Sequence, residues 1–244
     1  MIKGYVNEYE FCQVFHDKFV WDLEEKYINF LEDIYEKELD RKSYVICWKQ
    51  RVNNKTDVII RVGKEKKYIS IKSGKNNSVH LETLDTFVLF LKEINCPDNI
   101  VEIYKEYHKG LDVNGNRIGG KEYQEKYPTE LEELNSFLNK PESIKPAIDR
   151  FLFQGRDVDN DIVDAIVYGT ANNFMYATRK TIYDYLLSQD EKFSTPHFSL
   201  LVLQPWARNL NFNPKHEYRR KFVQVKWYRM DEHFKKIHWL MYLF

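Results

Sequence analysis

Apolar residues recur at helical spacing near the start of the chain and at strand-like spacing after it. Phe11, Phe15 and Phe19 repeat every four residues, and the pattern continues to Ile34, so that residues 6–39 are predicted to be helical. Asn7 has the chemistry of an N-cap for the first helix. Three segments rich in β-forming residues follow, at 43–50, 57–62 and 68–72. The polar sequence GKEKK joins the last two and predicts a β-hairpin.

The remaining pattern predicts a helix, a helical block and two further strands. Ser78 is expected to cap a helix that runs to about Asn95 and is ended by Pro97. Residues 98–190 are predominantly helical in pattern, including segments 129–139, 144–153 and 171–187. Strand character returns at 198–206 and 221–229. This order predicts an α/β (α+β) fold in which helices flank a sheet and a large helical insertion interrupts it.

The amino-acid composition is that of an ordered globular protein and does not by itself indicate a function. Of the 244 residues, 43% are hydrophobic, which excludes a disordered chain. The three cysteines are far apart and form no Cys-x-x-Cys pair, which favours buried free thiols in a reducing compartment over a zinc site. No signal-peptide pattern or run of transmembrane length is present, so we expect a soluble, cytoplasmic protein with no membrane partner.

The charges cancel overall but are separated along the chain. The formal net charge is zero, whereas residues 1–40 are strongly acidic and residues 206–236 strongly basic. A basic face that binds a polyanion and an ordinary solvated surface both remain open. Aromatic residues lie between the basic ones, which suits a nucleic-acid groove, although Phe222 and Trp227 could equally belong to the core. The candidate nucleic-acid-binding residues are Arg208, Lys215, Arg219, Arg220, Lys221 and Lys226.

The predicted hairpin carries the most informative cluster of polar residues. Asp57 opens its first strand and Lys72 closes its second, so antiparallel pairing brings both to one edge of the sheet. Ser70 shares a face with Lys72, because side chains alternate along a strand. Glu82 is expected about one turn inside the following helix, from which a short loop could return it to the same edge. Glu8 is expected on the inward face of the first helix.

Carboxylates beside a lysine at one edge of a sheet suit metal-assisted phosphodiester hydrolysis. Hard oxygen ligands favour Mg²⁺, with Mn²⁺ as a substitute. The metal polarises the phosphate and activates a water molecule, and a nearby ammonium orients that water and offsets the developing charge.

Asp57, the hairpin and Ser70-Ile71-Lys72 resemble the PD-(D/E)xK nuclease superfamily over roughly residues 5–95. The resemblance implies a restriction-endonuclease-like central mixed sheet. It also implies that Asp57 and the Ile71 carbonyl ligate the metal and that Lys72 positions the attacking water. Ser70 stands where the second acid is expected and would support the site by hydrogen bonding. Some members take that acid from the next helix, which assigns it here to Glu82.

Further implications follow from the same resemblance. Glu8 is similar to a helix glutamate that serves as an extra metal or water ligand, and the stretch SIKSGKNNSVH also resembles a group of uncharacterised Firmicutes proteins. The expected function is a Mg²⁺-dependent DNA endonuclease of the restriction or phage-defence type, with a homodimer as one arrangement for cutting both strands. RNA as substrate, as in an RNA-cleaving toxin, stays open, and so does a non-catalytic nucleic-acid-binding scaffold.

The resemblance also suggests a division of the chain into three segments. Residues 1–97 would form the first part of the nuclease core, and residues 98–190 a helical insertion or subdomain. Residues 191–244 would supply the C-terminal strands that complete the sheet, together with the basic loop.

Overall fold

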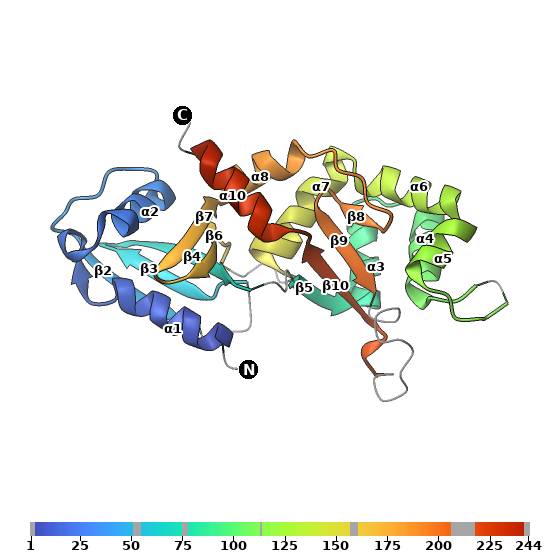
Figure 1. Cartoon of the computed structure of the whole chain (residues 1–244), viewed down its shortest axis with the longest axis horizontal. Helices are drawn as coiled ribbons and strands as arrows, with labels where there is room; N and C mark the ends of the chain where they lie inside the picture. Colours follow the sequence, from blue (N-terminus) through green and yellow to red (C-terminus); the bar gives the residue numbers. More distant parts are fainter. Residues whose placement is uncertain are drawn as a thin grey trace. The chain divides into compact units, whose positions relative to one another are not determined.

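The computed structural model describes residues 3–50, 55–74, 78–112, 114–156, 161–205 and 218–241. The chain divides into two compact units (Figure 1). The first unit comprises Met1–Asn77, Leu152–Tyr185 and Arg229–Phe244, and the second comprises Ser78–Phe151 and Leu186–Tyr228. The chain therefore passes between the units after residues 77, 151, 185 and 228. No helix in the described part of the chain is long and apolar enough to cross a membrane.

The first unit is built on a mixed sheet. Its strands in the described residues are, in spatial order, β1 (Lys18–Phe19), β2 (Tyr44–Lys49), β3 (Val58–Val62), β4 (Glu65–Lys72), β6 (Ala165–Thr170) and β7 (Asn173–Thr178). Neighbouring strands are antiparallel except for β4 and β6, which run parallel with Ile69 opposite Ala165. A parallel pair requires a long crossover connection, and here the chain passes through part of the second unit between these two strands.

The apolar side chains on one face of this sheet are buried by helices. Val58, Ile60, Ile69 and Ile71 belong to one buried cluster with residues of α1 (Lys3–Phe15) and α2 (Glu25–Tyr35). The expected inward packing of the phenylalanines of α1 is confirmed, since Phe11 and Phe15 are almost fully buried. The short helix η1 (Val20–Asp22) follows β1, and α8 (Arg179–Leu187) follows β7. Figure 1 shows α10 (Met230–Met241) running alongside β7, against which it packs.

The second unit has an antiparallel sheet of its own. Within the described residues its strands are, in spatial order, β5 (Ser78–Thr83), β10 (Phe222–Trp227), β9 (Leu201–Pro205) and β8 (His197–Phe198). Its helices are α3 (Leu84–Glu93), α4 (Asp98–Lys109), α5 (Gly120–Lys126), α6 (Pro128–Leu138) and α7 (Pro141–Ile148). Helix α7 continues into η2 (Asp149–Gln154), along which the chain returns to the first unit. The predicted α+β class, with a central mixed sheet flanked by helices, is confirmed.

Four predicted elements differ from the structure. The helical stretch predicted for residues 6–39 is interrupted by β1 and η1, and α2 begins only at Glu25. Residues 78–83 form strand β5 and not a helix, because β10 pairs with them, and Thr83 caps helix α3 by accepting a hydrogen bond from the Thr86 amide. Residues 165–178 form the β6–β7 hairpin and not a continuation of the helical block. The strands near the C-terminus, β9 and β10, do not extend the first sheet but form the second sheet with β5. The functional division of the chain at residues 97 and 190 stays a prediction.

The first helix also begins earlier than predicted. Helix α1 starts at Lys3, so Asn7 lies inside the helix and is not its N-cap. The Asn7 side chain instead donates from Nδ2 to the Gly169 carbonyl oxygen of β6 at 2.9 Å. Gly169 has a φ of +131°, and a Cβ there would lie 2.4 Å from the Asn173 carbonyl oxygen, so only glycine fits.

The expectation of buried free thiols is confirmed and leads to a testable prediction. Cys12, Cys47 and Cys96 are all buried and form no disulfide, and burial raises the pKa of Cys47 well above its usual range and that of Cys96 to about 11. Because the thiolate is the reactive form, Cys96 in the native protein should react with an aromatic disulfide reagent at pH 8 about 100-fold more slowly than a free cysteine. Absorbance of the released thiol, followed with and without guanidinium, measures this. A native thiol that reacts at the free rate would contradict the assigned environment.

Candidate active site

Asp57, Ser70 and Lys72 meet where strands β3 and β4 lie side by side. Asp57 immediately precedes β3, and its amide donates to the Ile69 carbonyl oxygen at 2.9 Å. Since Val58 pairs with Ile69, Asp57 lies opposite Ser70 on the neighbouring strand. Lys72 is the last residue of β4 and shares a face with Ser70. A local hairpin therefore positions all three side chains.

One carboxylate oxygen organises this group. Oδ2 of Asp57 accepts hydrogen bonds from the Ser70 hydroxyl at 3.0 Å, the Ile71 amide at 2.6 Å and the Lys72 ammonium at 3.4 Å. The Lys72 ammonium also donates to Ser70 Oγ at 2.7 Å. Ser70 is 1% exposed, whereas the side chains of Asp57 and Lys72 are 23% and 26% exposed. The buried Ser70 hydroxyl therefore holds the Asp57 carboxylate and the Lys72 ammonium in place, and both charged groups remain partly accessible to solvent.

The group offers oxygen ligands for a hard cation. Oδ1 of Asp57 accepts no hydrogen bond from the residues that the structure describes, and the Ile71 carbonyl oxygen lies 3.4 Å from the Lys72 ammonium. In the described residues no cluster of three or more His, Cys, Asp or Glu side chains could hold a metal ion. Mg²⁺ needs only one or two carboxylates when substrate phosphate and water supply the other ligands. The residues present therefore fit Mg²⁺ with a single carboxylate in this group.

Glu8 is held at the same edge of the sheet by an ion pair. Its Oε2 lies 2.5 Å from Nζ of Lys49, the last residue of β2. Lys49 pairs with Val58, the residue after Asp57. No hydrogen bond or ion pair among the described residues joins Glu8 directly to the Asp57 group. Its role as an additional ligand of metal or water stays a prediction.

Glu82 belongs to the second unit and has strong partners there. Its side chain is 0% exposed, and Oε2 lies 2.8 Å from a terminal guanidinium nitrogen of Arg150 and 3.5 Å from Nε2 of His80. Burial alone would raise the pKa of Glu82, but the contact with His80 and the hydrogen bonds from Arg150 outweigh it and lower the pKa. The role of Glu82 as a metal ligand stays a prediction. Arg150, its main partner, was not identified from the sequence, where it lies within an apolar helical pattern.

The candidate nucleic-acid-binding residues fall in two groups. Arg208 and Lys215 lie outside the described residues. On β10, Val223, Val225 and Trp227 are buried, which confirms Trp227 as a core residue and places Lys226 on the opposite face of the strand. The other candidates lie just before this strand. Arg219 stacks on Tyr218, and the Arg220 carbonyl is hydrogen-bonded to His108. Lys221 is exposed. Their contact with phosphate stays a prediction.

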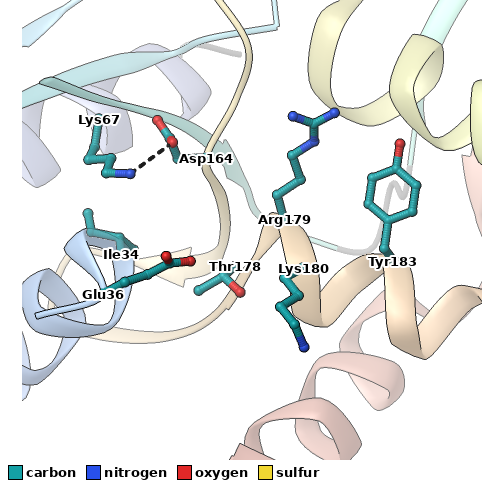
Figure 2. A pocket seen from close by; sticks show the side chains of 8 residues that line it. All are labelled: Ile34, Glu36, Lys67, Asp164, Thr178, Arg179, Lys180 and Tyr183. Atoms are coloured by element: carbon teal, nitrogen blue, oxygen red, sulfur yellow. Dashed lines mark hydrogen bonds and ion pairs between the residues drawn. The ribbon is translucent and has the colours of Figure 1, made fainter.

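A separate pocket of about 440 Å³ lies in the first unit (Figure 2). Figure 2 shows Lys67 and Asp164 next to one another in its lining, joined by an ion pair of 3.2 Å. Arg179 stacks on the rings of Phe153 and Tyr183. Lys67 lies five residues before Lys72 on the same strand, and its ammonium forms an ion pair with Asp164. It therefore provides a control for substitutions of Lys72.

Together the two units have a restriction-endonuclease-like fold, as the Asp57–Lys72 pattern predicts. A solved structure with this architecture is that of restriction endonuclease MspI in complex with its cognate DNA. The match covers 92% of this chain and 87% of the MspI chain, with a TM-score of 0.55 and 12% identical residues. At this identity the similarity concerns the fold alone. No family model and no curated protein sequence matches the chain.

Proposed function

We propose that the protein is a Mg²⁺-dependent endonuclease that hydrolyses DNA phosphodiester bonds, of the restriction or phage-defence type. The observation that carries this proposal is the solvent-accessible group of Asp57, Ser70 and Lys72 at adjoining strands of a restriction-endonuclease-like fold. The similarity in fold to MspI, whose structure contains its cognate DNA, supports DNA as the substrate class. RNA cleavage and a homodimer have no such support.

Each residue of the group has a distinct task in this reaction. Asp57 and the Ile71 carbonyl would hold Mg²⁺, which supplies charge neutralisation and a more acidic water molecule when bound. Lys72 orients the attacking water and offsets the negative charge that develops on the phosphate. Ser70 accepts a hydrogen bond from Lys72 at 2.7 Å and donates one to Asp57, so that it fixes the ammonium relative to the carboxylate.

The other predicted residues have supporting parts in the proposal. Glu8 would assist a second metal or water, and Glu82 would be the second carboxylate if the migrated-acid pattern of the resemblance applies. Arg208, Lys215, Arg219, Arg220, Lys221 and Lys226 would contact DNA phosphates. Such contacts add affinity that falls as salt concentration rises.

A non-catalytic DNA-binding scaffold is the alternative, favoured by one specific observation. Ser70 replaces the second acid, and Asp57 is the carboxylate that contacts Lys72 within the described residues. A scaffold would bind DNA in a salt-dependent manner with or without divalent metal. An enzyme requires the metal for cleavage.

Incubation of the protein with supercoiled plasmid, single-stranded DNA and RNA tests this function. We expect nicked or linear plasmid in Mg²⁺ or Mn²⁺ and at least about 100-fold slower cleavage in EDTA, because the metal supplies several kcal/mol of charge stabilisation. Fluorescence anisotropy with labelled duplex measures binding in parallel. Binding without cleavage in either metal would reject the enzyme in favour of the scaffold, and cleavage of RNA alone would replace the substrate class.

A further inference from the structure

A cavity of about 580 Å³ lies within the second unit, between helices α5–α7 and the segment of residues 188–197. Leu131, Ile144 and Phe193 give it an apolar lining. Leu131 and Ile144 are buried, whereas Phe193 is half-buried. A concave, largely apolar wall with a few placed polar groups is the usual character of a site for a small molecule.

His197 is the most tightly positioned polar residue of the lining. It is 4% exposed, its amide donates to Asn135 Oδ1 at 3.2 Å, and its carbonyl accepts from Asn139 Nδ2 at 3.0 Å. Ring nitrogen Nδ1 lies 2.8 Å from the Thr195 carbonyl oxygen. A carbonyl only accepts, so Nδ1 carries the proton and Nε2 is left as an acceptor. No described residue donates to Nε2.

The imidazole is neutral at physiological pH. Burial lowers the pKa of His197, and the hydrogen bond to Thr195 only partly opposes this effect. A neutral imidazole keeps the lone pair on Nε2. The Nε2 atom of His197 is therefore a prepositioned acceptor in the cavity, and it can accept a hydrogen bond from an N–H or O–H group of a ligand.

The charge around the cavity selects against anions. Among the described residues that line it are the carboxylates of Glu132, Asp190 and Glu191 and the single ammonium of Lys192. Glu132 and Asp190 are exposed, and neither forms an ion pair with a described residue. A ligand that carries a positive charge would be attracted here, and a phosphate or carboxylate would be repelled.

We propose that this cavity binds a small organic cation with a flat apolar body and an N–H donor. The cationic group meets Glu132 and Asp190, the N–H donates to Nε2 of His197, and the flat body packs on Phe193 and Leu131. The site is assigned from residues of the second unit and does not depend on the nuclease proposal.

Four related indole compounds test the three features of the ligand separately, by isothermal titration of the full chain. Tryptamine carries the cation and the ring N–H; tryptophol lacks the charge, indole-3-acetate reverses it, and 1-methyltryptamine lacks the ring donor. We expect saturable binding of tryptamine and affinities at least about fivefold weaker for tryptophol and 1-methyltryptamine, as expected for losing one charge contact or one hydrogen bond. We expect no measurable binding of indole-3-acetate.

Substitutions then connect binding to the named residues. The double variant Glu132→Gln/Asp190→Asn should weaken tryptamine to the level of tryptophol and leave tryptophol unchanged, whereas Glu133→Gln, beside Glu132 on α6, should change neither. In His197→Asn the amide can still donate toward Thr195 but lacks an Nε2, so tryptamine should lose its advantage over 1-methyltryptamine. Melting temperatures verify that each variant is folded. Equal binding of the cation and the anion, or no saturable binding of tryptamine at millimolar concentration, would overturn the proposal.

Discussion

Replacing Lys72 by alanine is expected to slow DNA cleavage by about 10²–10⁴-fold while DNA binding changes little, because one ammonium orients the water and stabilises the developing charge. The fold should persist, since Asp57 keeps its hydrogen bonds from Ser70 and the Ile71 amide. Single-turnover cleavage, with the protein in excess of the DNA and above the dissociation constant, measures the chemical step without product release. Lys72→Arg should restore little activity, because a planar guanidinium does not reproduce a compact ammonium.

Lys67→Ala is the matched control for this experiment. Lys67 lies on the same strand, is also partly exposed and also pairs with an aspartate, Asp164, at 3.2 Å. Its loss should leave cleavage within about twofold of wild type, because exposed pairs contribute little. If the two substitutions slowed cleavage equally, Lys72 would act only through the stability of the fold or the overall charge of the protein. Full activity of Lys72→Ala would remove the Asp57 group from the mechanism.

The Asp57 group could be predicted because it is local in sequence. Asp57 and Lys72 are 15 residues apart within one hairpin, so strand alternation and antiparallel pairing nearly determine their relation. The β6–β7 hairpin is equally local, with Thr170 opposite Asn173, but it was mistaken for part of the helical block. The helical periodicity of α8, which begins at Arg179, was extended backwards over strand β7 in the predicted segment 171–187.

Strand β5 shows a second reason why a pattern can mislead. Val79, His80 and Glu82 are buried in this strand, whereas Leu81, between the two polar residues, is 42% exposed. Alternation of polar and apolar residues would predict the opposite face to be buried. The inverted pattern is tolerated because Arg150, 68 residues away, neutralises Glu82. The environment of Glu82 therefore follows from a contact that the sequence around it does not contain.

Replacing Glu82 by leucine is expected to lower the free energy of unfolding by about 3–5 kcal/mol, because it leaves the Arg150 charge buried without its partner. The Arg150 side chain is 11% exposed, so solvent compensates little. The double variant Glu82→Leu/Arg150→Met should recover most of this loss, since apolar side chains of similar volume can replace a buried ion pair. Urea denaturation measures both variants. Glu93→Gln is the control, because Glu93 is 65% exposed and 3.9 Å from the same arginine, and it should cost little.

Acidification adds an independent measure of the Glu82–Arg150 pair. The pKa of Glu82 is lowered in the folded protein, so the unfolded state binds its proton more readily. The contribution of Glu82 is therefore complete above the unfolded pKa of about 4.3 and is lost as the pH falls through the folded pKa. Glu82→Leu should remove this part of the pH dependence. If Glu82 is also the second metal ligand, the double variant Glu82→Leu/Arg150→Met should be stable but inactive. Cleavage retained by a stable Glu82→Leu/Arg150→Met protein would assign Glu82 to the core of the second unit and leave Asp57 as the metal-binding carboxylate.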